Sequence, residues 1–406
     1  MTNQTPTTRP ARSSEMKSVG RRDVMLSGGA LLGVSALGGC TTGMQPRIRT
    51  SSAPVLAPVR ASADRLTRIT VCTRPFRADG PRLDVEPIGQ KTVVHNYGHG
   101  GSGWSLSWGS STIAVQKAMS VSPRKIAVIG CGALGLTSAT LLQRAGVPVT
   151  IYAKDRPPDV RSSLATGMFT PDSRICLDGH DTPDFRKLWE EMCRTSFQAY
   201  QNYLGMPGDP VEWIDIYHLS NLNAPRASSV EGAVKFAELW RDLANDLGPN
   251  SVELGADANP FPGRHVRRST NMMFNITEYA HLLISDFLEA GGHIETREFH
   301  SPADFASLPE KTLINCTGYG ARALFGDQSV IPVRGQLARL IPQPEVSYGL
   351  TYDYVSLVPR RDGMVVQAYG ADESIGYGDD STAPDRAEAE HAVATIASVF
   401  APAVNA

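Results

Sequence analysis

A glycine-rich loop near residue 130 has the residue types and the spacing needed to bind the phosphates of a dinucleotide. Gly130, Gly132 and Gly135 form a G-x-G-x-x-G pattern directly after the apolar run 126–129. The first glycine permits a tight turn, the second lets the backbone approach a pyrophosphate, and the third lets a helix pack closely on a strand. The helix that follows offers unpaired N–H groups and a positive dipole end to the phosphates.

The elements expected around this loop are those that the motif requires. The sequence predicts a strand over 126–129, a helix that stops at Gly146, and a second strand over 147–152. Asp155 follows the second strand and is the candidate for binding the ribose, with Lys154 as a phosphate neighbour. This context predicts a dinucleotide cofactor without separating FAD from NAD; a glycine turn that only packs a helix on a strand is the alternative. The first turn of the helix adds two candidate contacts, Ala133 and Leu134.

A second glycine-rich segment, HNYGHGGSGWSLSWG from His95 to Gly109, precedes the loop. From His95 to Gly103 it resembles, nearly residue for residue, a segment of the D-amino acid oxidase family, which is FAD-dependent and includes D-aspartate oxidases. Four other stretches are similar to pieces of that family, and the resemblance covers about residues 68–400. They are SSLATGMFTP from Ser162, INCTGYGAR from Ile314, PVRGQL from Pro332 and TRPFRADGPRLDVE from Thr73.

The resemblance implies FAD as the cofactor and adds contacts outside the loop. In the family the glycine segment approaches the flavin ring. The helix expected over 105–119 points its N-terminus at that ring, where negative charge develops on reduction. The implied contacts are Gly100, Gly101, Gly103 and Trp104 in this segment, Ser162, Ser163, Thr166 and Gly167 in the loop under the flavin, and Thr317 and Gly318 near the phosphate and ribose.

The resemblance also implies the residues that bind the substrate. Arg74 is the arginine that pairs two-pronged with the substrate carboxylate, and the backbone carbonyl of Gly101 holds the amine. The family also places a tyrosine on a strand that ends in a proline turn. In LTYDYVSLVPRRDG a continuous strand would put Tyr352, Tyr354 and Ser356 on one face. Ser356 stands where the family often has a tyrosine, so Tyr352 or Tyr354 is the candidate hydroxyl.

The order of these pieces differs from that of the family. The arginine segment and HNYGHGG come last in the family but first in this chain, which a circular permutation explains. Residues 120–123 would link the family's last helix to its first strand, with the new ends after the helix 384–399 and before Arg68. The predicted fold is α/β, a Rossmann-like FAD-binding domain plus an antiparallel-sheet substrate domain in permuted order. Within the unit 67–406, the FAD-binding parts are about 92–175 and 265–325, and the substrate domain is about 176–264, 326–400 and 67–91.

Residues 1–40 have the layout of an export signal. Arg21 and Arg22 form a twin arginine before a Gly- and Ala-rich apolar stretch, which predicts the twin-arginine route for proteins that fold before export. LGGC, which ends at Cys40, resembles a bacterial lipobox and predicts a lipid anchor at the cell envelope. Residues 41–66 are rich in Ser, Pro, Ala and Arg, and predict a flexible linker. A disordered leader with a chance arginine pair is the alternative.

The composition excludes several other classes. A count of 39 Lys and Arg against 41 Asp and Glu gives a net charge of −2, which argues against a nucleic-acid partner. The six cysteines form no C-x-x-C pair, and no Cys or acidic residue completes a ligand set around His95 and His99, so no metal site is predicted. Beyond the leader, no run of about 18 apolar residues predicts a membrane span.

We therefore expect FAD-dependent oxidation of a small D-amino acid to the imino acid, which hydrolyses to a 2-oxo acid and ammonia. Oxygen would accept the electrons and become hydrogen peroxide. The alternatives are an exported dehydrogenase that passes electrons to a quinone, an oxidase of glycine or N-methyl amino acids, and an FAD-binding envelope protein without catalysis. Arg360 and Arg361 either favour an acidic substrate such as D-aspartate or cap a surface turn.

Overall fold

The computed structural model describes residues 53–221, 232–370 and 373–401. The chain divides into two units, Met1–Thr50 and Ser51–Ala406, and the elements described below belong to the second. The predicted export signal and lipobox over 1–40, and the first part of the predicted linker, lie outside the described residues. Among the described residues, no helix is both long enough and apolar enough to cross a membrane.

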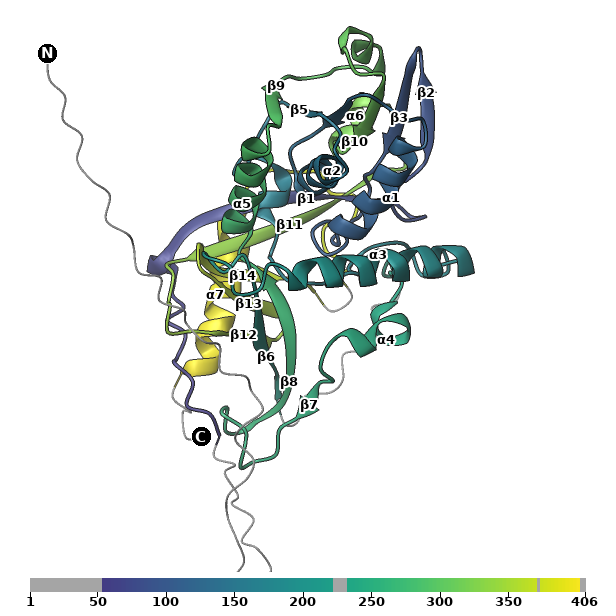
Figure 1. The fold of residues 1–406 in the computed structure, drawn as a ribbon. Coiled ribbons are helices and arrows are strands. Elements are labelled where there is room, and N and C mark those ends of the chain that lie inside the picture. Colours follow the sequence, from purple (N-terminus) through teal and green to yellow (C-terminus); the bar gives the residue numbers. More distant parts are fainter. Residues whose placement is uncertain (1–52, 222–231, 371–372, 402–406) are drawn as a thin grey trace, which may run out of the picture. The chain divides into compact units, whose positions relative to one another are not determined.

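A six-stranded sheet carries the glycine loop (Figure 1). Its strands are β2 (Val85–Ile88), β3 (Lys91–His95), β4 (Ile126–Ile129), β5 (Val149–Ala153), β9 (His293–Thr296) and β10 (Thr312–Asn315). The order is β2-β3-β10-β4-β5-β9, and every neighbouring pair is parallel except β2 with β3. All four residues of β4 are buried, as expected for a parallel strand covered on both faces. The strand predicted over 126–129 is confirmed, and the one predicted over 147–152 begins two residues later.

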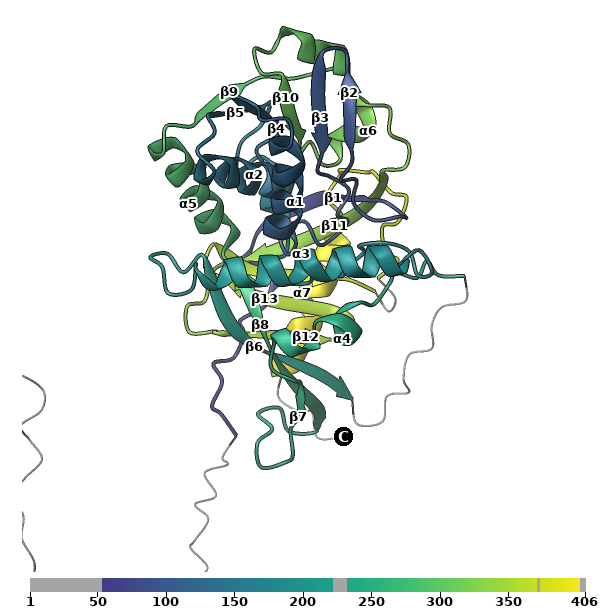
Figure 2. The ribbon, with the colours of Figure 1, turned by 45° about the vertical axis from the view of Figure 1, so that its right-hand side comes forward.

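Helices pack around this sheet and between it and a second, larger sheet (Figures 1 and 2). They are α1 (Ser107–Met119), α2 (Ala133–Arg144), α3 (Pro183–Gln201), α4 (Trp240–Leu243), α5 (Ile276–Glu289) and α6 (Gly320–Leu324), with short 3₁₀ turns at Ala63–Arg65, Arg161–Leu164, Asn245–Leu247 and Pro302–Ser307. Helix α2 contacts both α1 and α5, and α3 contacts α1. The hydroxyl of Thr182 caps α3 by accepting from the N–H of Phe185 at 3.2 Å. The apolar stripe of α3, with Trp189 and Met192 fully buried, faces the core as its spacing predicts.

The larger sheet has eight strands. They are β1 (Leu66–Phe76), β6 (Val211–Asn221), β7 (Val252–Glu253), β8 (Arg264–Phe274), β11 (Ile331–Leu340), β12 (Tyr348–Tyr352), β13 (Val355–Arg360) and β14 (Gly363–Ala368). The order is β1-β11-β14-β13-β12-β6-β8-β7. Because β12 and β6 run parallel, the sheet is mixed rather than purely antiparallel as predicted. Tyr217 and Leu219 face a core shared with α7 (Arg386–Phe400), whereas Ile216 and His218 face the opposite side.

The segment 53–66 packs against the larger sheet and so differs from the flexible linker predicted over 41–66. Val59 and Ala61 are buried in the apolar core that contains α7. The hydroxyl of Tyr348 donates to the carbonyl of Ala57 at 2.7 Å. The folded unit therefore begins well before residue 67, because burial of these apolar side chains fixes the segment on the sheet.

A tight hairpin interrupts the single strand that was expected to carry the candidate tyrosines. Strand β12 ends at Tyr352, β13 begins at Val355, and these two residues pair directly. Asp353 and Tyr354 have φ angles of +46° and +59°, the left-handed conformation of a two-residue hairpin turn. The prediction that Tyr352, Tyr354 and Ser356 share one face of a continuous strand is therefore wrong, because the chain reverses its direction between them.

Candidate active site

A cavity of about 1330 Å³ lies between the carboxyl ends of the parallel strands and one face of the larger sheet. Ligands of open α/β sheets bind at this edge. The volume exceeds the roughly 300–1,000 Å³ of common small-molecule pockets, so a large cofactor and a small second molecule both fit. Most of the predicted site residues line it: Arg74, Gly100, Gly101, Gly103, Trp104, Gly130, Gly132, Ala133, Leu134, Lys154, Asp155, Ser162, Thr166, Gly167, Thr317 and Gly318.

Close backbone contacts shape the glycine loop. Gly130 has a φ of +110°, and a Cβ there would lie 2.6 Å from the carbonyl oxygen of Cys316. Gly135 does not line the cavity. A Cβ at Gly135 would collide with the carbonyl of Gly130, so its absence lets α2 pack against β4 as predicted. Ser163, predicted as a cofactor contact, also lies outside the cavity wall.

Ser162 joins two of the segments that line the cavity. Its hydroxyl accepts from the backbone N–H of Ala133 at 3.2 Å, at the start of α2. Its carbonyl accepts from the indole N–H of Trp104 at 2.8 Å. The loop around Ser162 is therefore tied both to the glycine loop and to the segment that precedes α1.

The glycines before α1 are required by a neighbouring loop. Gly100 has a φ of +53°, and a Cβ there would collide with the carbonyl of Arg174. The N–H of Gly101 donates to the carbonyl of Ser173 at 3.0 Å, and a Cβ would lie 2.7 Å from the Ser173 hydroxyl. Gly100 and Gly101 are therefore glycines because of the neighbouring loop and not because of a flavin. An approach of the backbone to a flavin fits Gly103, where an added Cβ meets nothing within 4 Å.

Arg74 lies on β1 and its side chain reaches the cavity. Its Nη1 donates to the carbonyl of Arg334 at 3.1 Å, which holds the guanidinium against β11. A Cβ at Gly335 would collide with that guanidinium, so the glycine of PVRGQL creates the space that Arg74 occupies. A guanidinium has five N–H donors, and those not used on the carbonyl suit a two-pronged pair with a carboxylate.

Arg174 is a second arginine in the cavity wall, and sequence reasoning missed it. Its side chain is buried, its Nη1 lies 3.2 Å from a carboxylate oxygen of Glu373, and its Nε donates to the Glu373 carbonyl at 2.9 Å. Burial, and then the charge of Arg74, lowers the pKa of Arg174 to about 10. Two arginines and one carboxylate thus lie together, an excess of positive charge that fits one substrate carboxylate. Arg174 stands in an irregular loop, where no periodic pattern marks a functional residue.

Neither predicted tyrosine lines the cavity. The hydroxyl of Tyr352 donates to the Asn221 side chain at 3.2 Å, and Tyr354 lies at the hairpin tip with 39% of its surface exposed. Neither tyrosine is therefore placed to supply a substrate-binding hydroxyl in this cavity. The hydroxyl groups on this wall include those of Ser269, Thr351, Ser356 and Tyr369.

His218 lies on β6 in the same wall, and both of its ring nitrogens are hydrogen-bonded. Nδ1 lies 2.9 Å from the Thr351 hydroxyl, and Nε2 lies 2.7 Å from the Ser269 hydroxyl. Burial, and then the charge of Arg267, lowers the pKa of His218 to about 4, so the ring is neutral at pH 7. A neutral imidazole has one donor and one acceptor nitrogen, so one hydroxyl donates to the ring and the other accepts from it.

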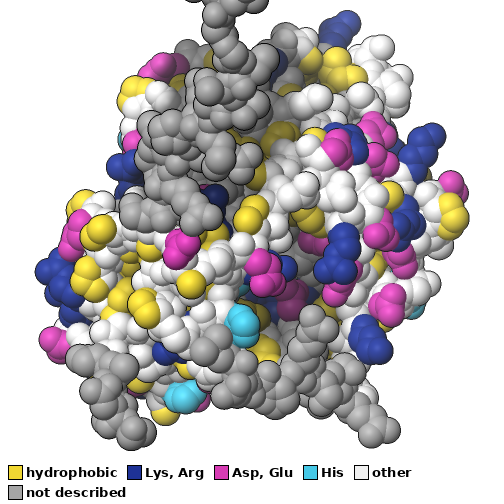
Figure 3. Space-filling view, turned by 90° about the horizontal axis from the view of Figure 1, so that it is seen from below, with side chains coloured by type: hydrophobic (Ala, Val, Ile, Leu, Met, Phe, Trp, Pro, Cys, Tyr) yellow, Lys and Arg dark blue, Asp and Glu magenta, His cyan; other side chains and the backbone are white. Residues whose placement is uncertain are grey.

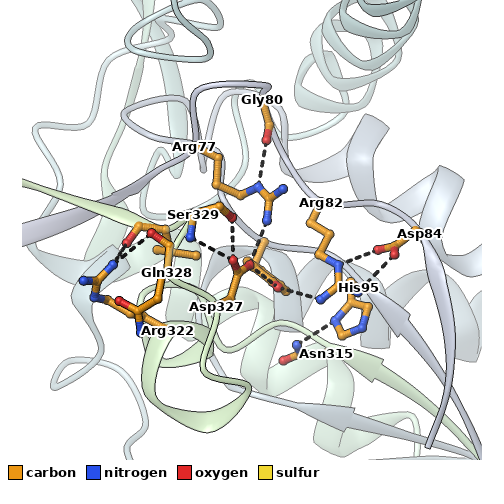
Figure 4. A network of polar contacts seen from close by, with 12 residues as sticks. Arg77, Gly80, Arg82, Asp84, His95, Asn315, Arg322, Asp327, Gln328 and Ser329 are labelled. Carbon is orange, nitrogen blue, oxygen red and sulfur yellow. Dashed lines mark hydrogen bonds and ion pairs between the residues drawn. The ribbon is translucent and has the colours of Figure 1, made fainter.

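Asn315 holds Thr317 in place and belongs to a polar network with His95, part of which Figure 4 shows. The Asn315 side-chain oxygen accepts from the N–H of Thr317 at 3.2 Å and from its hydroxyl at 2.8 Å. The Asn315 amide donates to Nδ1 of His95 at 3.0 Å, so His95 carries its proton on Nε2 and donates to Glu86 at 2.9 Å. The network continues through Arg82, Tyr97, Asp327 and Arg77.

His95 and His99 both have hydrogen-bond partners within the protein. His95 belongs to the network above, and Nε2 of His99 lies 2.7 Å from the Ser110 hydroxyl. Burial lowers the pKa of His99 to about 3, so it stays neutral. Within the described part of the chain, no group of three His, Cys, Asp or Glu side chains is arranged to hold a metal ion.

The two arginines at the end of β13 form structural ion pairs away from the cavity wall. Arg360 is buried; its Nε donates to Asp362 at 2.8 Å and its Nη1 to the Ala165 carbonyl at 2.8 Å. Arg361 lies 2.7 Å from Asp209. Neither residue lines the cavity, so their side chains do not favour an acidic substrate there. On the face shown in Figure 3, basic and acidic side chains are interspersed.

The cavity wall fits FAD. The glycine loop and the start of α2 offer backbone N–H groups to a pyrophosphate, and Asp155 stands beyond β5 for a ribose. An added Cβ at Gly103 or Gly318 meets nothing within 4 Å, so both positions leave open space along the wall. The segments that the resemblance assigned to FAD thus all reach one cavity of sufficient size.

Comparison with known proteins also indicates an FAD-dependent protein. The model of a family described as "DAO: FAD dependent oxidoreductase" matches residues 125–406. A D-amino acid oxidase of Dugesia ryukyuensis is 26% identical over 253 residues, covering 59% of this chain and 68% of the relative. A D-amino-acid oxidase of Dictyostelium discoideum is 24% identical over 278 residues (68% and 73%), and the human D-aspartate oxidase is 28% identical over 252 residues (57% and 65%).

Similar solved structures include an iminodiacetate oxidase from Chelativorans sp. BNC1, at 16% identity and a TM-score of 0.45, covering 64% of this chain and 73% of that one. A glycine oxidase from Bacillus cereus has 16% identity and a TM-score of 0.41, covering 60% and 70%. The family model spans well over half of the chain and includes the glycine loop. Its cofactor is accordingly FAD, because the chain belongs to the DAO family of FAD-dependent oxidoreductases.

Proposed function

We propose that the protein oxidises a D-amino acid to the imino acid, which water hydrolyses to a 2-oxo acid and ammonia, while oxygen is reduced to hydrogen peroxide. The observation that carries this proposal is the placement of Arg74 in the wall of the FAD cavity, where Gly335 leaves room for its guanidinium. Relatives named D-amino acid oxidase, at 24–28% identity, also support it.

Binding and orientation perform most of the work in this mechanism. Bound FAD supplies the capacity to accept the two electrons and the hydrogen that leave the substrate Cα. Arg74 fixes the carboxylate by a two-pronged pair, and the carbonyl of Gly101, which also lines the cavity, accepts from the amine. With two substituents of Cα fixed, the two enantiomers direct their Cα hydrogen to opposite sides, so only the enantiomer whose hydrogen would face the bound FAD can react.

The test is a panel of D- and L-amino acids, glycine and N-methylglycine, with peroxide and 2-oxo acid measured as products. Turnover of D-forms with one peroxide per 2-oxo acid supports the proposal. Turnover with a quinone but not with oxygen identifies a dehydrogenase. Oxidation of glycine or N-methylglycine alone contradicts the D-amino acid assignment, and FAD binding without any turnover contradicts catalysis.

We also propose that the chain is a circular permutation of the family fold. The segment His95–Gly109 lies before the part that the family model matches, yet it lines the same cavity. Residues 120–125 suffice to join the end of α1 to the start of β4. The segment 53–61 and α7 contribute to one apolar core. The two ends of the folded unit thus pack together, as expected if the chain of the family fold was opened between them.

Export by the twin-arginine route, with lipidation of Cys40 at the cell envelope, is our proposal for residues 1–40. Replacing both Arg21 and Arg22 by Lys should leave the precursor in the cytoplasm. Cys40→Ala should move the exported protein from the membrane fraction to the soluble fraction. An unchanged distribution in both variants, measured by cell fractionation, contradicts the proposal.

A further inference from the structure

A row of polar side chains crosses the cavity face of the larger sheet. The strand pairing places Gln367 of β14 beside Ser356 of β13, Ser356 beside Thr351 of β12, and Thr351 beside His218 of β6. Directly paired residues of neighbouring strands point to the same face, and all four line the cavity. We call these four residues the polar row. At about 4.8 Å per strand, it is about 14 Å long.

The neighbouring row on the same face is apolar. Val358 pairs with Val365, and Gly349 pairs with Ile216. The three apolar side chains belong with Leu337 to one cluster on this side of the sheet. On β6, β12, β13 and β14 the hydrogen-bonding side chains that line the cavity are therefore those of the polar row, and on β8 Ser269 and Asn271 also line it.

One end of the polar row lies beside the carboxylate-binding arginine. Gln367 shares a small adjoining pocket with Arg74, Arg174 and Tyr369. The side-chain oxygen of Gln367 accepts from the Thr166 hydroxyl at 2.6 Å, which leaves its NH₂ group as a donor. A substrate fixed by its carboxylate at Arg74 can thus extend its side chain along the row toward His218.

The polar row offers hydrogen bonds but no full charge. Its four side chains carry one amide group, two hydroxyl groups and one neutral imidazole. Beside it, Arg74 and Arg174 line the cavity together with Glu373, and the substrate α-carboxylate pairs with Arg74. An ionised substrate side chain would lie against Ser356 and Thr351 without a counter-charge, because Arg267, which pairs with His218, stands one strand beyond the row at an exposed position. An aliphatic side chain would leave the Gln367 NH₂ group and the remaining hydrogen-bonding capacity of the two hydroxyl groups unmatched.

We infer that the preferred substrate is a D-amino acid with a neutral hydrogen-bonding side chain, a hydroxyl or a carboxamide, and that the polar row recognises it. This inference rests on the proposed function and narrows it to one substrate class. It makes Thr351 and His218 specificity-determining residues, because their hydrogen bond fixes the far half of the row.

The test compares substrates of similar shape in matched variants. D-Serine, D-asparagine and D-glutamine are measured against D-2-aminobutyrate, D-leucine, D-aspartate and D-lysine. Wild-type kcat/KM should be about tenfold higher for the neutral polar substrates, and Thr351→Val should lower these values about tenfold while changing the aliphatic ones less than about twofold. Thr395→Val on α7, whose hydroxyl donates to the His391 carbonyl at 3.0 Å, is the matched control and should change neither class.

The outcomes separate this inference from the proposed function. A wild-type enzyme that oxidises D-amino acids but prefers D-aspartate, D-lysine or the aliphatic substrates overturns the inference alone. A Thr351→Val variant that changes both classes equally does the same. If that variant loses FAD, Ser356→Ala provides the same comparison within the row. Oxidation of no D-amino acid overturns the proposed function and this inference with it.

Discussion

At the scale of single residues, the account depends most on Arg74. In Arg74→Gln, kcat/KM for a D-amino acid should fall by roughly 30- to 4,000-fold, because truncating one partner of a desolvated charge pair costs about 2–5 kcal/mol. The FAD content, read from the visible absorbance, should stay unchanged. Arg68→Gln, at an exposed position of the same strand, is the control. A fall of less than about threefold in Arg74→Gln would mean that another group binds the carboxylate.

His218 gives the free energy of unfolding a pH dependence. Burial lowers its pKa from an ordinary 6.5 to about 4, so the folded protein favours the neutral ring. This stability is present above pH 6.5 and is lost as the pH falls toward 4. Between pH 7 and pH 4.5 this residue should account for a loss of about 2 kcal/mol, which His218→Asn should lack. Urea denaturation at both pH values measures the difference, and equal losses in the two proteins refute it.

Residues could be predicted from the sequence where a rigid backbone pattern demands one residue type. Gly130 and Gly135 follow from the loop geometry alone, and the structure gives each the expected close contact. Arg174 and His218 could not be predicted in this way. Arg174 stands in an irregular loop, and His218 becomes a cavity residue only through the pairing of β6 with β12, which no local pattern encodes.

At the scale of elements, the hairpin between β12 and β13 provides the sharpest prediction. Tyr354 holds a φ of +59° at an exposed turn position, a conformation that glycine adopts without a steric cost. Tyr354→Gly should therefore raise the free energy of unfolding by about 0.5–1 kcal/mol and leave kcat/KM within about twofold. Thermal unfolding and steady-state kinetics test both statements. A tenfold loss of kcat/KM in Tyr354→Gly would contradict this prediction and show that Tyr354 contributes to the active site.

Elements with a clear pattern of apolar residues could be predicted from the sequence. A hairpin, at which the chain reverses its direction, could not. The strand over 126–129 matches its predicted position. The hairpin was missed because Asp353-Tyr354 lacks the glycine that normally marks a two-residue turn. The ordered segment 53–61 was missed because its composition resembles a linker, although Val59 and Ala61 bury against the sheet.

At the scale of the whole molecule, the proposed circular permutation predicts that the family order can be restored. Joining residue 401 to residue 53 by a flexible Gly/Ser linker, and opening the chain within 120–124, should preserve the FAD spectrum and keep kcat/KM within about threefold. The contacts that form the core do not depend on chain order. The same linker inserted within 120–124 of the original chain is the control. A soluble, FAD-free product from the reordered chain alone would contradict the permutation.

The central claim is that one cavity brings FAD and a D-amino acid together. The most direct measurement is the visible absorption spectrum of the purified protein before and after anaerobic addition of D-serine, D-alanine and their L-forms. We predict flavin bands that only the D-forms bleach and that return when air is admitted. Bands that no D-amino acid bleaches, or that the L-forms bleach equally, would contradict the claim.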